Sequence, residues 1–73
     1  MNNEEKEIEE FLKKLPIGTK FKYRNYFYHV LGIFDNYNVA VKYYGKHKQW
    51  WHYEFFDAWT LWYSYEHDEI EIK

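Results

Sequence analysis

Few residues in this chain are suited to catalysis. The sequence has no cysteine and one serine, Ser64, and no histidine and acid are spaced around that serine as a nucleophilic triad would need. An acidic cluster near the end of the sequence, suited to a carboxylate pair or a divalent ion, consists of Glu66, Asp68, Glu69 and Glu71. Ordinary domains place such charge on exposed strand edges, where it discourages aggregation, and we interpret the cluster in that way. We therefore predict that the protein is not an enzyme.

The histidines offer no recognised metal site. They are His29, His47, His52 and His67. His47 and His52 are separated by a spacing that is not typical of zinc ligands, and the sequence has no thiol to complete a site. The three glycines are too far apart to form a phosphate-binding loop. We expect neither a metal nor another cofactor.

A stretch rich in basic and aromatic side chains is a stronger candidate, for binding rather than catalysis. It runs from Lys42 to Glu54, and Gly45 near its middle indicates two strands joined by a turn. The residues expected to bind a partner are Lys42, Tyr44, Lys46, His47, Lys48, Trp50 and His52, with the acidic Glu66, Asp68, Glu69 and Glu71 as a second surface. Lysines beside rings suit single-stranded nucleic acid, because cations meet phosphates and rings stack on bases. The same side chains suit a protein interface, where Trp and Tyr supply much of the binding energy.

The number of aromatic side chains favours an exposed binding patch. The chain has 19 of them among 73 residues. A domain of this size removes only about 60% of its unfolded surface from water, so its core is small. Each ring can bury on the order of 150–250 Å², and a few rings fill such a core. We expect several of the others to stay at the surface, where aromatic patches often mark binding sites.

Charge is distributed unevenly along the sequence. The net charge is −4 over residues 1–12, +7 over 13–53 and −5 over 54–73, which leaves −2 overall. Dedicated nucleic-acid binders are usually basic overall, and the two acidic ends would repel phosphates. An acidic face could also dock on the basic surface of a nucleic-acid-binding protein. We therefore predict a protein-interaction module. A nucleic-acid-binding barrel is the alternative, and a small enzyme subunit or a carboxylate-dependent nuclease is a third hypothesis.

A helix and several strands must position these side chains. Apolar residues recur at helical spacing at Ile8, Phe11, Leu12 and Leu15, which predicts a helix over 3–14 that Pro16 ends. Alternation predicts strands over 19–24, 27–34, 37–44, 49–55 and 69–73, with turns at 24–25, 35–36, 45–48 and 67–68. The side chains expected to face inward on the first three are Phe21, Tyr23, Tyr28, Val30, Val39, Val41 and Tyr43, with Lys20, Lys22, Arg24 and Lys42 outward. Gly32 predicts a bulge or a close approach of the backbone to another group.

Two features stay open at this level. On the fourth strand Trp51, Tyr53 and Phe55 can face inward with Trp50 and His52 outward, or the register can be reversed, because Trp occupies both positions 50 and 51. After Asp57, a helix cap, residues 58–63 can form a short helical turn, or residues 60–66 can form a strand.

Together these elements predict one α+β domain over 1–73. An N-terminal helix within 1–15 packs on a small curved antiparallel sheet or barrel of four or five strands over 19–73. The order of elements from Thr19 to Lys73 resembles a Src-homology-3-type barrel with a short helical turn before its last strand. Excess rings and an edge strand at 69–73 could also pair two copies, so a homodimer is an open alternative.

A second resemblance is carried by two short runs, GTKFKY at 18–23 and KQWWHY at 48–53. They look like short accessory proteins of phages and mobile elements. That resemblance implies a protein that binds a host component, including inhibitors of CRISPR–Cas and other defences. No signal-peptide pattern and no apolar run of about 20 residues is present, so we expect a cytoplasmic protein in a bacterial host and no membrane partner.

Overall fold

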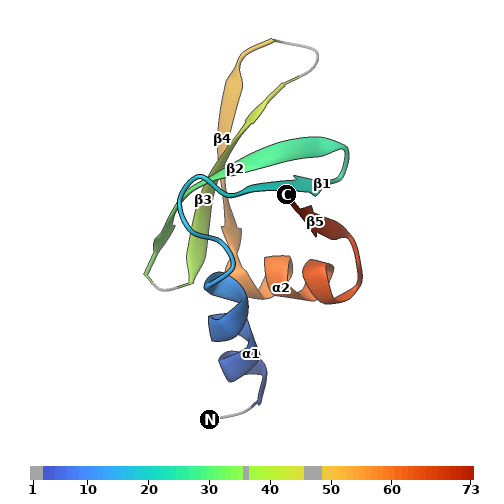
Figure 1. The fold of residues 1–73 in the computed structure, drawn as a ribbon. Helices are drawn as coiled ribbons and strands as arrows, with labels where there is room; N and C mark the ends of the chain where they lie inside the picture. The colour runs from blue at the N-terminus through green and yellow to red at the C-terminus, as the bar shows by residue number, and fades with distance from the viewer. Residues whose placement is uncertain (1–2, 36, 46–48) are drawn as a thin grey trace.

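A computed structural model describes residues 3–35, 37–45 and 49–73, which form two helices and one five-stranded antiparallel sheet. The elements are α1 (Asn3–Leu12), β1 (Lys20–Tyr23), β2 (Tyr26–Phe34), β3 (Asn38–Tyr44), β4 (Trp51–Asp57), α2 (Ala58–Glu66) and β5 (Ile70–Ile72). The strand order is β4-β3-β2-β1-β5, and both helices lie together at one end of the curved sheet (Figure 1). The expected α+β class is confirmed, and the sheet is open, with β4 and β5 as its edges.

Helix α1 ends two residues earlier than expected. Ile8 and Phe11 are its buried residues, in agreement with the predicted apolar stripe. After Leu12 the bonding tightens, because the Lys14 N–H donates to the Phe11 carbonyl at 2.9 Å and the Leu15 N–H to the Leu12 carbonyl. Such three-residue spacing is typical of a closing helix end. The side chain of Leu15 is still buried beneath the sheet.

Strands β1 and β2 form a hairpin around the predicted turn. Phe21 and Tyr23 are buried, as expected. Arg24 and Asn25 both have positive φ, 52° and 70°, as the central pair of a type I′ turn requires. That turn matches the right-handed twist of the flanking strands, which explains why so short a connection suffices.

A bulge interrupts the pairing of β2 with β3. Val30 pairs with Val41 and Gly32 pairs with Ala40, so Leu31 is an extra residue without a partner. The bulge predicted at Gly32 is therefore confirmed. An extra residue bends the strand and increases its twist, which contributes to the curvature of the sheet.

On β4 the side chains of the odd-numbered residues face away from the core, which is the second of the two alternatives that the sequence left open. Trp51, Tyr53 and Phe55 are exposed, so of the two alternatives left open the one that places them inward is not the observed one. The reason lies at the end of the strand, where Phe56 pairs with the fully buried Val39 and packs against the core. Because side chains alternate along a strand, placing Phe56 inward sends the rings at 51, 53 and 55 outward.

Helix α2 replaces the strand considered for residues 60–66. Asp57 caps it, because its Oδ1 accepts a hydrogen bond of 2.7 Å from the Thr60 N–H. Ala58, Leu61 and Trp62 are buried on one side of the helix, a spacing that a strand could not provide. The turn predicted at 67–68 is present, with Asp68 at a φ of 59°, and it leads into β5.

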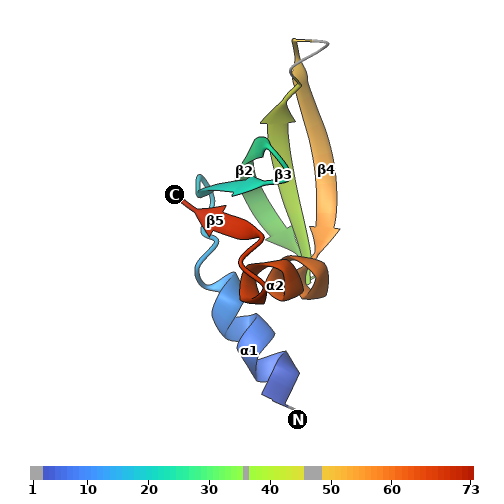
Figure 2. The ribbon, with the colours of Figure 1, turned by 90° about the vertical axis from the view of Figure 1, so that its right-hand side faces the viewer.

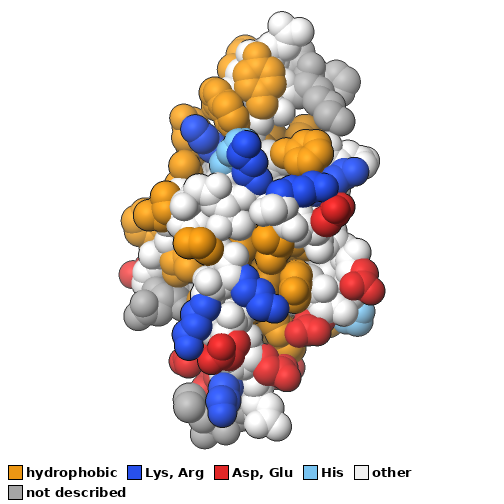
Figure 3. Space-filling view, viewed as in Figure 1, with side chains coloured by type: hydrophobic (Ala, Val, Ile, Leu, Met, Phe, Trp, Pro, Cys, Tyr) orange, Lys and Arg blue, Asp and Glu red, His pale blue; other side chains and the backbone are white. Residues whose placement is uncertain are grey.

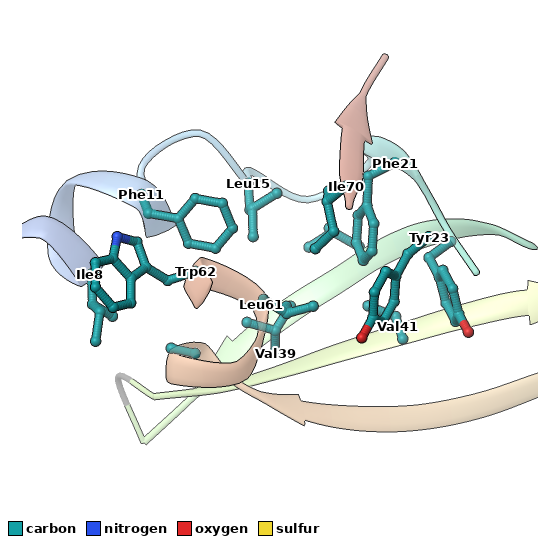
Figure 4. Packing of buried hydrophobic residues seen from close by; sticks show 13 residues of the cluster. Ile8, Phe11, Leu15, Phe21, Tyr23, Val39, Val41, Leu61, Trp62 and Ile70 are labelled. Atoms are coloured by element: carbon teal, nitrogen blue, oxygen red, sulfur yellow. The ribbon is translucent and has the colours of Figure 1, made fainter. Parts of the chain in front are cut away.

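The hydrophobic core lies between the two helices and the concave side of the sheet. Figure 4 shows side chains from α1, α2 and the strands meeting there. Its members are Ile8, Phe11, Leu15, Phe21, Tyr23, Tyr28, Val30, Val39, Val41, Ala58, Leu61, Trp62 and Ile70.

Burial, followed by the nearby Glu54 charge, raises the pKa of Tyr28 to about 12. Neither of the two described helices is long and apolar enough to cross a membrane.

Candidate binding surface

The side of the sheet that faces away from the core carries lysines and rings together. Paired residues on neighbouring antiparallel strands project to the same side, so the strand register defines this surface. We call it the outer face, and it consists of Lys20, Lys22, Phe27, His29, Phe34, Lys42, Tyr44, Trp51, Tyr53 and Phe55. It draws on four strands, β1 to β4, which are far apart in the sequence but adjacent in the sheet.

A row of rings on β4 forms the aromatic part of the outer face. Trp51, Tyr53 and Phe55 are 41%, 68% and 67% exposed. The Phe34 ring from β2 lies 5.8 Å from that of Phe55, and the Tyr44 ring from β3 lies 5.5 Å from that of Trp51, both edge to face. Ten of the 19 aromatic side chains are exposed, which confirms that the core does not absorb them all.

Cations lie beside several of these rings. The Lys42 Nζ is 4.5 Å from the centre of the Trp51 ring, and the Lys22 Nζ is 5.9 Å from that of Phe27. The imidazole of His29 meets the same Trp51 ring edge to face at 5.3 Å. Trp51 thus joins cationic and imidazole groups from β3 and β2 into one contiguous patch.

His29 lies in a positive environment. Burial and then the charges of Lys20 and Lys42 lower its pKa from 6.5. Both lysines belong to the outer face, so the part of the pKa shift that adds to the larger effect of burial reflects repulsion between a protonated His29 and the cations gathered there. An anion placed on this surface would relieve that repulsion.

The residues predicted in the 42–54 hairpin are divided between the two sides of the sheet. Lys42 and Tyr44 belong to the outer face, whereas His52 lies on the opposite side, its ring stacked on that of Tyr43 at 5.2 Å. Trp50, just before β4, is exposed, and its ring lies 5.8 Å from that of His52. The predicted residues Lys46, His47 and Lys48 lie outside the described part of the chain.

Gly45 permits the position of His52. A Cβ at Gly45 would lie 2.6 Å from the His52 Nε2, closer than side-chain atoms approach one another. The missing side chain therefore leaves space for the imidazole to lie beside the backbone and stack on Tyr43.

The acidic residues at 66–71 are spread over three elements. Glu66 ends α2, Asp68 and Glu69 lie in the following turn, and Glu71 is on the edge strand β5. The Glu71 carboxylate accepts a hydrogen bond of 2.9 Å from the Lys73 Nζ, and this bond lowers the pKa of Glu71. All four are exposed, and the described residues contain no group of three or more His, Cys, Asp or Glu placed to hold a metal ion.

Charge is separated over the surface, as Figure 3 shows. Many of the visible Lys and Arg side chains gather over the strands, beside exposed rings, while most of the visible Asp and Glu side chains lie lower, towards the helices and along one side. The separation is partial, because α1 and the residues after it also carry lysines, one of which, Lys13, pairs with Glu10 at 3.2 Å.

Two features of the surface escaped the sequence analysis. His29 and Phe27 alternate with the buried Tyr28, a pattern that places both on the outer side of β2. On α2, the rings of Trp59 and Tyr63 stack at 5.0 Å, and that of Tyr63 lies 4.2 Å from His67. Trp59, Tyr63 and His67 are spaced four residues apart, which is typical of neighbours on one face of a helix. This spacing was not used in the sequence analysis.

Comparisons of this chain with protein family models, with curated proteins and with solved structures found no match.

Proposed function

We propose that the protein is a non-enzymatic interaction module that binds another protein through the outer face. The observation that carries the proposal is the row of three exposed rings, Trp51, Tyr53 and Phe55, on one strand. Large rings supply most of the binding energy at protein interfaces when a partner removes them from water. In the isolated chain these rings contribute little to the core, so binding is the role that accounts for them.

The charges bordering the rings define the partner's chemistry. Lys20, Lys22 and Lys42 favour a surface with acidic side chains around an apolar centre, because complementary charges orient and accelerate docking. The acidic residues at 66–71 offer a second contact, to a basic surface such as that of a nucleic-acid-binding protein. An origin in a phage or mobile element and the inhibition of a host defence protein stay predictions from the resemblance stated above.

The matched pair Trp51→Ala and Trp59→Ala tests the choice of surface. Both tryptophans are 41% exposed, but Trp51 is on the outer face and Trp59 is on α2. We expect a partner captured from a bacterial lysate by the tagged wild-type chain to be lost with Trp51→Ala and kept with Trp59→Ala. If Trp59→Ala alone abolished capture of the partner, the interface would lie on α2 and not on the outer face. Charge reversal at Glu69 and Glu71 tests the acidic contact in the same assay.

Single-stranded nucleic acid is the second candidate, and one observation favours it. Lysines and rings occupy the same face, with the Lys42 ammonium beside Trp51, an arrangement that suits phosphates and stacked bases. Each lysine–phosphate contact would add about 0.7 to the salt slope of log K for a single strand. We expect a labelled oligothymidylate to bind with a slope of roughly 2, from three lysines, if this candidate holds. An absence of binding at low salt would remove it.

A further inference from the structure

The edge strand β4 lacks several of the features that usually protect a sheet edge. It is seven residues long and contains neither lysine nor proline. The other edge, β5, is three residues long, contains Glu71 and is flanked by Glu69 and Lys73. Short length, lysine and proline are common ways of preventing strands from pairing with another molecule, and β4 has none of these; its charged residues are Glu54 and the terminal Asp57. Figure 2 shows β4 along one side of the sheet with no other described element beyond it.

The direction of the free backbone groups on β4 follows from its pairing with β3. The Gly45 N–H donates to the Trp50 carbonyl at 2.9 Å, and the Ala58 N–H donates to the Tyr37 carbonyl at 2.7 Å. Hydrogen-bonded pairs alternate with non-bonded pairs in an antiparallel ladder. Even-numbered residues of β4 therefore direct their N–H and C=O groups towards β3. The odd-numbered Trp51, Tyr53 and Phe55 direct theirs to the open edge.

The sequence of β4 is close to symmetrical about Tyr53. Reading outward from it, the strand has one polar residue on each side, His52 and Glu54, and then one large ring on each side, Trp51 and Phe55. An antiparallel pair of identical strands centred on Tyr53 would place His52 opposite Glu54 of the second copy, twice. An imidazole N–H can donate to a carboxylate, so the two polar positions complement each other.

We propose that two copies of this chain associate by antiparallel pairing of their β4 strands, with Tyr53 opposite Tyr53. In this register the pairs Tyr53–Tyr53 and Trp51–Phe55 are those whose backbone groups point to the open edge, so they form the hydrogen-bonded pairs. Rings at paired positions on the outer face contact one another across the strands, which adds to the association. The self-complementary pairing selects a second copy as the occupant of this edge.

Other registers are disfavoured by the same geometry. A shift that places Glu54 opposite Glu54 brings like charges together, which destabilises a cross-strand pair. A shift by one residue sets an odd-numbered position against an even-numbered one, so outward backbone groups would meet groups already bonded to β3. Pairing centred on Tyr53 avoids both faults and joins the two outer faces into one surface.

Charge exchange at the two polar positions tests the register. His52→Glu would place Glu opposite Glu54, and Glu54→Lys would place Lys opposite His52. We expect each variant alone to raise the dimer dissociation constant about tenfold or more in sedimentation equilibrium, because two cross-strand pairs change together. In an equimolar mixture each acidic position faces a basic or imidazole group, so the mixture should form a heterodimer about as stable as the wild-type dimer.

Two controls keep the test decisive. Glu7→Lys makes the same charge change on an exposed position of α1 and should leave the dimer intact. Circular dichroism of each variant shows that a loss of association is not a loss of folding. The proposal is overturned if the wild-type chain is monomeric up to millimolar concentration, if Glu7→Lys disrupts the dimer as strongly as Glu54→Lys, or if mixing two folded variants restores nothing.

Discussion

The Lys42 ammonium lies 4.5 Å from the centre of the Trp51 ring, a contact that runs diagonally between β3 and β4. Register pairs Lys42 with Tyr53 and Trp51 with Tyr44, so the ammonium reaches across the pleat to a ring that is not its direct partner. The contact holds a cation and an indole in one orientation on an exposed surface. It thereby orders part of the outer face before any partner arrives.

A double-mutant cycle should detect this contact. We expect Lys42→Ala and Trp51→Ala to be coupled by about 0.5–1 kcal/mol in urea unfolding, the range for an exposed cation–π pair. Lys20→Ala with Trp51→Ala is the matched cycle, since Lys20 lies on the same face without contacting that ring, and its effects should add. Equal coupling in both cycles would mean that general charge, rather than the ring contact, is responsible.

Leu61 should be among the residues most sensitive to truncation. Its side chain is fully buried between α2 and the sheet. Leu61→Ala is expected to cost about 2–5 kcal/mol, from lost apolar burial and the cavity left behind. This loss is a substantial share of the roughly 4–11 kcal/mol expected for a domain of this size, so the midpoint of urea unfolding should fall clearly. Ile17→Ala, at a position that is 78% exposed, should change the free energy of unfolding by less than about 0.5 kcal/mol.

The cap of α2 gives a third prediction. Asp57→Ala removes the acceptor of the 2.7 Å bond from the Thr60 N–H and should destabilise the chain by about 0.5–2 kcal/mol. Asp57→Asn keeps an oxygen acceptor and should cost much less. Thermal unfolding of the two variants measures the difference. If both lose the same stability, the carboxylate charge rather than the cap bond is what matters at this position.

Stability should also depend on pH through His29. Its pKa in the folded chain is below the ordinary 6.5, because of burial and then the neighbouring Lys20 and Lys42. As the pH falls through 6.5 the unfolded chain binds a proton more readily than the folded chain, so stability falls on acidification and returns above that pH. His29→Gln should reduce this dependence, measured by urea unfolding at several pH values between about 5 and 8. A wild-type chain and variant with parallel profiles would contradict it.

The sequence predicted those elements whose signal is local. The apolar stripe of α1, the turn at Arg24 and Asn25 and the bulge at Gly32 each follow from a few neighbouring residues, and each is present. The side of the sheet on which the Tyr53 side chain lies could not be predicted from its neighbours in the sequence. Alternation on β4 is equally regular in both registers, and the choice depends on Phe56 reaching Val39, a contact between strands.

Only part of the candidate surface was predicted, because the rest depends on contacts between strands. Lys42 and Tyr44 were identified because they lie in a conspicuous basic and aromatic stretch. His29 and Phe34 belong to a strand whose sequence is typical of a buried strand. Only the sheet register places His29 beside Trp51 and Phe34 beside Phe55. The strand alternative for residues 60–66 was wrong because aromatic content, which favours strands, outweighed the helical spacing of the buried Leu61 and its neighbours.

The unpaired Leu31 has a consequence for how this chain could change in length. Before the bulge, odd-numbered residues of β2 such as His29 project to the convex side, and after it even-numbered residues such as Phe34 do so. Deleting Leu31 would set Val30 and Gly32 at consecutive positions opposite Val41 and Ala40, so Ile33 and Phe34 would keep their present faces while the bulge and its bend were lost. The bulge is thus the one place within β2 at which the strand can lose a residue and keep every side chain on its face, whereas a deletion elsewhere in β2 would turn the residues on one side of it to the opposite face.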